Sequence, residues 1–247
     1  MLIKTRFAVA FAATSLLAAC GGGGGAAGTA DTSLPAAGSF PIQTALTYVF
    51  THGLQKSLTV TGTAGTGANL LPITGSVTFS TGTASSVTFN NAAAQQVTQT
   101  LVGSLTIAGQ SVPLSSTSQI LLNPSYAELG TTGNDSGSND YCVVSGGGTF
   151  PANVTAGQSG SISTFACYTD SSKNVPTGTA TETYVARAGS AANTLDFQLI
   201  DKVYDTSGKQ TDTQSTTYNV TTAGVPSVSQ INVEGVQNGV TVTITGQ

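Results

Sequence analysis

Residues suited to acid–base chemistry are few in this sequence, and the only histidine is His52. General-base catalysis near neutral pH most often uses histidine, and serine hydrolysis also needs a nucleophile and an orienting acid. No Gly-x-Ser-x-Gly elbow occurs, because Gly157-Gln158-Ser159-Gly160 has the wrong spacing. His52 precedes Gly53 between two strand-like segments, residues 44–51 and 54–61, and histidine tolerates positive φ better than most residues. We therefore predict that His52 is a turn residue and not a catalytic base.

Paired carboxylates held across a cleft would serve glycoside hydrolysis. Four aspartates lie close together on either side of Ser207-Gly208, namely Asp196, Asp201, Asp205 and Asp212. Asp, Ser and Gly are common in tight turns, so a solvated hairpin tip explains this cluster better. The sequence therefore names no catalytic residue. A β-rich periplasmic hydrolase or accessory enzyme stays the alternative to a non-enzymatic protein.

A run of oxygen-bearing side chains, residues 134–140, has the alternation that calcium loops use. The run lacks the spacing of an EF-hand and its closing glutamate, and its residue types are also ordinary in turns. No phosphate-binding Gly-x-x-x-x-Gly-Lys loop occurs in the sequence. We therefore predict neither a metal site nor a cofactor.

The N-terminus has the composition of an export signal. A short basic start precedes an almost unbroken apolar run from Phe7 to Leu17, which is too short to span a bilayer. The segment Leu17-Ala18-Ala19-Cys20 resembles the lipobox of bacterial lipoproteins. This resemblance implies cleavage after residue 19, a diacylglyceryl group on the Cys20 thiol and a fatty acid such as palmitate on the new amine. The alternative is an ordinary signal peptide that leaves Cys20 as a free thiol.

Two or more acyl chains hold a protein stably at a membrane, so a modified Cys20 would be a permanent anchor. Gly21 follows it instead of aspartate, which by resemblance to enteric lipoproteins favours the outer membrane. The Gly-rich residues 20–40 predict a flexible tether with an r.m.s. reach of roughly 25 Å. We expect a signal peptide over residues 1–19, this tether, and a β-rich body over residues 41–247.

The other two cysteines, Cys142 and Cys167, make one pair in a compartment that favours disulfides. Two buried free thiols are the alternative. A bond between them would close a loop of about 25 residues and stabilise the fold by roughly 3.5 kcal/mol in the chain-entropy model. Two thiols and the distant His52 do not make the four-ligand set of a structural zinc site.

Charged residues make up 7% of the chain, against about 25% in typical soluble proteins. Removal of residues 1–19 takes away Lys4 and Arg6 and leaves five basic against eleven acidic residues, a side-chain charge of −6. Nucleic acid is therefore not an expected partner. Hydrophobic residues make up 39%, which suffices for a core, so the surface must consist mainly of Thr, Ser, Asn, Gln and Gly.

Period-two alternation of apolar and hydroxyl-bearing residues dominates the body and predicts half-buried strands. The clearest examples are residues 58–61, 77–80, 87–90 and 240–245. No sustained helical period follows residue 40, although residues 92–96 could form one turn of helix. The fold class is therefore all-β: a mainly antiparallel meander that forms a curved sheet, a sandwich or a partly open barrel.

Short turn signals join these strands into hairpins. Asn238-Gly239 has the residues of a type I′ turn, and Ala108-Gly109 and Ser207-Gly208 resemble two further tips. Two Thr-Gly pairs, at residues 74–75 and 177–178, are offset by 103 residues, and the last two hairpin tips by 99. Such offsets suggest duplication of a unit of roughly 100 residues. The halves would be residues 41–140 and 141–247, with chance matches in a Thr- and Gly-rich sequence as the alternative.

These features predict a lipid-anchored protein of the cell envelope with a structural, adhesive or ligand-binding role. The membrane, reached through the lipid on Cys20, is one expected partner. An envelope protein, a glycan or an apolar ligand is another, and a curved sheet can enclose an apolar ligand without any catalytic group. The sequence has no tryptophan to stack on sugar rings.

Overall fold

The computed structural model describes residues 38–66, 69–135, 138–237 and 240–247, without the side chains of residues 134–139 and 236–240. The export signal, the lipobox with Cys20 and most of the tether lie outside this part of the chain. The Asn238-Gly239 turn and most of the oxygen-rich run at residues 134–140 also lie outside it.

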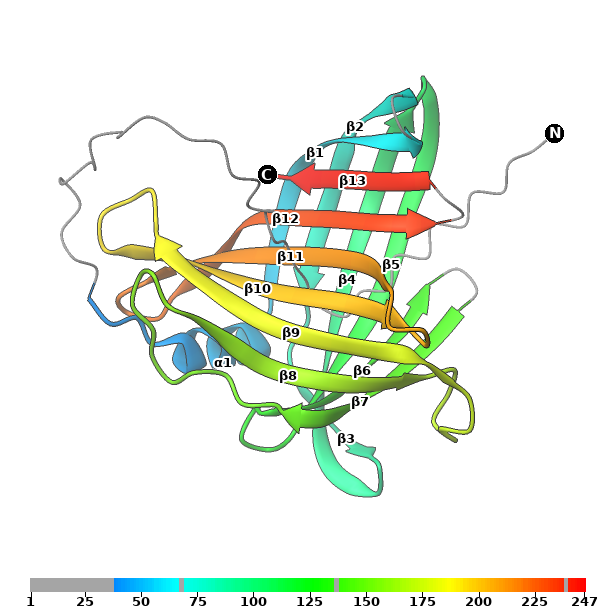
Figure 1. Cartoon of the computed structure of the whole chain (residues 1–247). Helices are drawn as coiled ribbons and strands as arrows, with labels where there is room; N and C mark the ends of the chain where they lie inside the picture. Colours follow the sequence, from blue (N-terminus) through cyan, green and yellow to red (C-terminus); the bar gives the residue numbers. More distant parts are fainter. Residues whose placement is uncertain (1–37, 67–68, 136–137, 238–239) are drawn as a thin grey trace, which may run out of the picture.

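Within the described residues the chain forms one helix and thirteen strands (Figure 1). Every strand pairing is antiparallel, so the predicted all-β antiparallel meander is confirmed. The elements are α1 (Ile42–His52), β1 (Leu54–Thr66), β2 (Asn69–Thr81), β3 (Ser85–Phe89), β4 (Ala92–Ile107), β5 (Gln110–Leu122), β6 (Glu128–Asp135), β7 (Ser138–Gly147), β8 (Ser159–Tyr168), β9 (Pro176–Ala188), β10 (Thr194–Asp205), β11 (Gln210–Thr221), β12 (Pro226–Gln237) and β13 (Val240–Gly246).

The sheet closes on itself into a barrel. β1 pairs with β13, and β2 pairs with the second half of β4, so twelve strands form a closed ring. The short β3 pairs only with the beginning of β4 and stands outside the ring. Closure removes the exposed strand edges that an open sheet would present. The architecture is thus more specific than the curved sheet, sandwich or partly open barrel that the sequence suggests.

The alternation predicted from the sequence separates the lumen from the outer wall. Val60, Val77 and Leu101 point inward and belong to the main hydrophobic core. Their neighbours Thr59 and Thr78 point outward, as successive strand residues must. A transmembrane barrel needs the reverse order, with an apolar outer band and a polar interior. The outer faces of β1 and β2 are therefore polar and suit water and not acyl chains.

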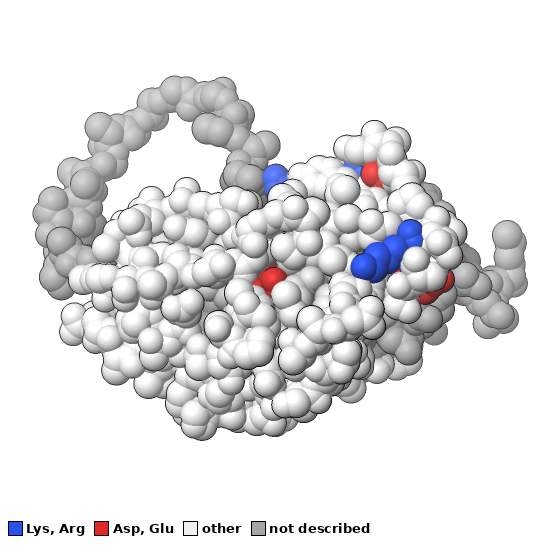
Figure 2. Space-filling view, turned by 90° about the horizontal axis from the view of Figure 1, so that it is seen from below, with Lys and Arg blue, Asp and Glu red and all other residues white. Residues whose placement is uncertain are grey.

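The surface is correspondingly poor in charge. Figure 2 shows a face on which Lys, Arg, Asp and Glu side chains are few and scattered among uncharged residues. None of the helical residues that the structure describes forms a segment long and apolar enough to cross a membrane.

The predicted strand over residues 44–51 is wrong, because this segment lies in α1. The buried residues of α1 recur at the spacing of a helix face: Ile42, Ala45, Leu46, Val49 and Phe50. That period was missed in a segment that also contains three β-favouring threonines. The helix covers one end of the barrel, where the Phe50 ring packs on Tyr126 and Phe150 from two loops.

Two predicted hairpin tips are confirmed by their backbone geometry. Ala108 and Gly109 have φ of 50° and 79°, as a type I′ turn requires. Gly208 has a φ of 80° in the tip between β10 and β11. Residues 92–96 belong to β4 and not to a turn of helix, and Asn90 and Asn91 before them form a further turn with positive φ.

The proposed duplication stays a prediction. Six barrel strands (β1, β2 and β4–β7) precede residue 148 and six (β8–β13) follow residue 158. The boundary between the predicted halves, at residues 140–141, lies within β7 of the continuous barrel.

Candidate functional site

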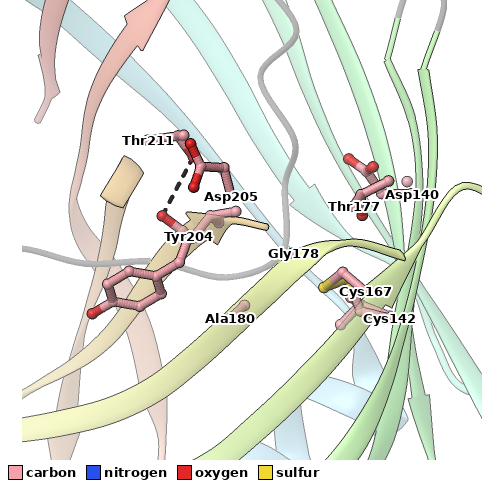
Figure 3. A pocket seen from close by; sticks show the side chains of 12 residues that line it. Asp140, Cys142, Cys167, Thr177, Gly178, Ala180, Tyr204, Asp205 and Thr211 are labelled. Atoms are coloured by element: carbon pink, nitrogen blue, oxygen red, sulfur yellow. Dashed lines mark hydrogen bonds between the residues drawn. A yellow bond between two sulfur atoms is a disulfide. The ribbon is translucent and has the colours of Figure 1, made fainter. Parts of the chain in front are cut away.

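The lumen contains a cavity of about 180 Å³ at the end opposite α1. Its walls come from β6 to β11 and include Asp140, Asp205, Ala180, Val203 and the two cysteines. Figure 3 shows Asp140 beside Thr177 and Asp205 beside Thr211, on separate sides of the cavity, with the cysteine pair below. A second, wholly apolar void of about 30 Å³ lies among β1, β2, β4, β5, β12 and β13. That half of the lumen is therefore a packed core.

Cys142 and Cys167 face each other directly on β7 and β8 and form a disulfide. Both are buried in a small cluster with Phe165, Ala180 and Val203, which we call the apolar collar. The collar forms the floor of the cavity, since the disulfide, Ala180 and Val203 also line it. The expected pairing of the two cysteines is thus compatible with the register of the strands.

Removal of the disulfide should destabilise the body substantially. Replacing Cys142 and Cys167 together with serine is expected to lower the free energy of unfolding by about 3.5 kcal/mol, because the unfolded chain regains the freedom of a 25-residue loop. Urea denaturation of the double variant and the wild type measures this difference. Non-reducing peptide mapping should join the two cysteine peptides in wild-type protein. Free thiols in freshly exported protein would contradict the pairing.

Below the collar lies a buried layer of carboxyl groups. Ser163, Glu182 and Asp201 are directly paired across β8, β9 and β10, and Glu128 reaches the same place from β6. Their exposed fractions are 1% for Glu182, 4% for Asp201 and 7% for Glu128. We call Glu128, Glu182 and Asp201 the acid layer. Ionised carboxylates in such a place are costly unless paired.

Two members of the acid layer, Glu128 and Glu182, have a raised affinity for protons. Burial raises the pKa of Glu182 well above its ordinary value, and the neighbouring charges of Glu128 and Asp201 raise it further. Burial also raises the pKa of Glu128, although hydrogen bonds from Glu182 and Ser163 oppose this. We therefore place the shared proton on Glu182, which donates it to Glu128, and the Ser163 hydroxyl also donates to Glu128. Burial also raises the pKa of the adjacent Tyr218 hydroxyl.

A second group of acids lies at the level of the cavity. Burial raises the pKa of Asp140, which lines the cavity from β7. Burial also raises the pKa of Asp212 on β11; a hydrogen bond from Thr211 opposes this, and repulsion by Asp140 adds to it. Asp205 differs, because its carboxylate accepts hydrogen bonds from the backbone N–H groups of Ser207 and Lys209. These bonds, with that of the Ser207 hydroxyl, lower its pKa and fix the hairpin turn.

The prediction that the four aspartates form a solvated hairpin tip is therefore wrong in part. Asp205 does serve the tip, but Asp201 is buried in the acid layer and Asp212 points into the lumen. Asp196 lies on the outer face, where it accepts a hydrogen bond from Asn219. Proximity in sequence suggested one environment, whereas alternation along β10 and β11 sends neighbouring acids to opposite sides of the wall.

Sequence reasoning missed Glu128, Glu182 and Ser163 altogether. One signal was available for Glu182, because it shares a strand face with Ala180 and Ala186, both buried. A glutamate on the apolar face of a predicted strand indicates a special environment. Nothing local marked Glu128, whose lumenal position depends on the pairing of β6 with β5.

His52 ends α1 and is exposed, so the predicted turn position is only approximately right. Gly53, with φ of 74°, takes the positive φ that we assigned to the histidine. The imidazole stacks on the Tyr48 ring with centroids 4.2 Å apart, and its Nδ1 lies 2.9 Å from the Thr51 hydroxyl oxygen. The His52 side chain lies at the end of the barrel opposite the cavity, on a different element from the acids described above.

Two carboxyl groups that share a proton can activate water in some hydrolases. Here Glu128 and Glu182 do not line the cavity, because the apolar collar separates them from it. A molecule in the cavity therefore rests against the collar, and it reaches the pair only where a collar side chain moves aside. Across the described part of the chain, no group of three or more His, Cys, Asp or Glu side chains is arranged to hold a metal ion.

Comparison with known proteins yields little. No protein-family model matches the sequence, and no curated protein matches it. Among solved structures, a porin-like protein from Bacteroides uniformis is similar over 77% of this chain and 96% of its own, with 12% identity and a TM-score of 0.23. A TM-score of this size establishes neither a shared fold nor a shared function. The chain's role therefore has to be inferred from its own geometry.

Proposed function

We propose that this chain is a lipid-anchored protein of the bacterial cell envelope, at the outer membrane, whose barrel binds a small molecule in its lumen. The observation that carries the binding role is the cavity of about 180 Å³ at the end of the lumen that α1 leaves open. Barrels of this kind bind ligands at their mouths, in clefts that combine apolar walls with a few polar groups. The collar supplies the apolar wall and Asp140 a polar group.

The position of the tether supports this role. Phe40 pairs with Val154 beside α1, so the chain that leads to Cys20 leaves the barrel near its closed end. The cavity opens at the opposite end and would face away from the lipid. The polar outer faces of β1 and β2 described above are consistent with a barrel held beside a membrane and not within it.

An adhesive role has less support in the described residues. Among the described residues, large exposed apolar side chains are few and come from five separate segments of the chain: Tyr48, Leu70 with Leu71, Val102, Val175 and Val225. Protein–protein interfaces usually require a contiguous patch of several hundred Å². Scattered exposed residues are ordinary on a monomeric surface.

Binding in the cavity can be tested with a neutral probe. We expect n-butanol to bind the lipid-free body saturably and to shift backbone NMR signals of residues around the cavity, such as Ala180 and Val203. Gly133→Leu should abolish these shifts, because no heavy atom lies within 4 Å of where a β-carbon would stand and the side chain can fill the cavity. Thr179→Leu, which points outward from β9, is the matched control. Shifts that survive Gly133→Leu, or no saturable binding at all, would refute the proposal.

A further inference from the structure

The ionisable side chains in the part of the lumen lined by β6 to β11 are all acids. Among the described residues, the carboxyl groups of Glu128, Asp140, Glu182, Asp201 and Asp212 all point inward from β6 to β11. The basic side chains do not oppose them: Arg187 and Lys202 lie on the outer faces of β9 and β10, while Lys56, Lys173 and Lys209 lie at strand ends or in turns. A cavity with acids and no bases attracts cations.

Within the acid layer, the carboxyl oxygens of Glu182 receive no hydrogen bond. Neither side-chain oxygen of Glu182 accepts a hydrogen bond from a protein group, although the side chain is only 1% exposed. Its contact with Glu128 depends on a proton that Glu182 itself supplies. On the opposite wall the Ser118 hydroxyl, also 1% exposed, has no partner in the described structure. Buried polar atoms are almost always satisfied in native proteins, so unsatisfied ones indicate a missing partner.

The distance from the cavity to this layer is short. Ala180 and Val203 form part of the cavity floor, and Glu182 and Asp201 follow two residues away on the same faces of β9 and β10. Two residues of a strand span about 6.6 Å. Ala180 leaves little side chain between the cavity and Glu182. A group bound against the collar therefore lies within a few atoms of a carboxyl that lacks a donor.

From these observations we propose that the lumen binds a compact organic cation, an ammonium group on a short apolar stem. The stem would pack against the disulfide and Val203, and the ammonium would displace the collar locally at the small Ala180 side chain and donate hydrogen bonds to Glu182. This inference rests on the proposed binding function and names its ligand class. A metal ion fits less well, because the described acids make no metal-holding group.

Binding should release a proton. In the free protein burial raises the pKa of Glu182 well above its ordinary value, and the charges of Glu128 on β6 and Asp201 on β10 raise it further. Tyr218 on β11 and Ser163 on β8 lie beside the same group of carboxyls. When an ammonium arrives as the charged species, Glu182 gives its proton to solvent and becomes the carboxylate partner. Affinity for the cation should therefore rise with pH as long as the pH lies below the raised pKa of Glu182. A neutral ligand of the same shape should show no such dependence.

The test compares n-butylamine with n-butanol by isothermal titration calorimetry, with the lipid-free body at pH 5.5 and 7.5. We expect the amine to bind at least tenfold more tightly than the alcohol at pH 7.5, with a smaller advantage at pH 5.5. Its enthalpy should vary with the ionisation enthalpy of the buffer, which reports proton release. Glu182→Gln should remove the preference for the amine and leave butanol binding intact. Glu234→Gln removes an exposed outer acid on β12 and should change neither affinity.

The outcomes separate this inference from the proposed function. Equal affinity for amine and alcohol, or a preference that persists in Glu182→Gln, would overturn the cation assignment while the lumen remains a binding site. Failure of both probes to bind would overturn the binding function itself. If Glu182→Gln is poorly folded, Asp201→Asn removes the neighbouring carboxyl and should weaken amine binding alone by at least threefold, and unchanged amine binding in that variant would also overturn the assignment.

Discussion

Replacing Cys20 with alanine is expected to release the protein from membranes completely. Without the thiol no diacylglyceryl group can be attached, and an anchor of two or more acyl chains is lost in one step. Metabolic labelling with a radioactive fatty acid should fall to background in the variant. Intact mass of the membrane-extracted wild type should show loss of residues 1–19 and the added mass of the acyl chains.

Gly22→Ala is the matched control, because it alters the same segment outside Leu17-Ala18-Ala19-Cys20. It should be labelled and membrane-bound as the wild type is. Labelling of Cys20→Ala at the wild-type level would exclude the lipobox. A wild-type protein cleaved after Ala19 but carrying no acyl mass would instead indicate an ordinary signal peptide and a free Cys20.

Glu182→Gln is expected to stabilise the body at neutral pH and to change how its stability depends on pH. Burial and the charges of Glu128 and Asp201 raise the pKa of Glu182 in the folded state above the ordinary 4.5. The folded protein then binds this proton more tightly than the unfolded chain does. Its stabilising contribution is complete below about pH 4.5 and is lost as the pH rises through the folded-state pKa. Glutamine keeps a donor for Glu128 and cannot ionise.

Urea denaturation between pH 4 and pH 8.5 measures the effect. The free energy of unfolding of Glu182→Gln should exceed that of the wild type by a gap that widens with pH, by at most about 1.4 kcal/mol per pH unit for one proton. Glu234→Gln, an exposed acid on the outer wall, should run parallel to the wild type. A pH-independent gap for Glu182→Gln would show that the acid layer does not hold its protons in the folded state.

The two halves of the lumen differ in a way that bears on the predicted duplication. The wall made by β1, β2, β4, β12 and β13 is apolar and packed, whereas the cavity and most of the acids lie on β6 to β11. Glu182 and Asp201 stand on β9 and β10, the strands that would correspond to β2 and β4 under an offset near 100 residues. If the barrel arose by duplication, its chemistry would have diverged on one side only.

The sequence alone determined the local features of this protein. Alternation of apolar residues with Thr and Ser specified strands and their inward faces, since a strand exposes successive side chains on opposite sides. Turn chemistry located the tips at Ala108-Gly109 and Ser207-Gly208, because positive φ restricts which residues can stand there. The number of cysteines and the export signal predicted the Cys142–Cys167 pair. The helix was the main local error, because threonines masked its period.

Only the tertiary structure decided what the lumen contains. Closure depends on the pairing of β1 with β13, which joins residues about 180 positions apart, and on the pairing of β2 with β4, which bypasses β3. Neither pairing leaves a mark in any one segment. Glu128, Glu182 and Asp201 meet because their three strands curve around one interior. The raised pKa values of Glu128 and Glu182 come from burial that no sequence window contains. Strand periodicity fixes the face of a side chain, whereas its neighbours across the lumen depend on how the whole sheet closes.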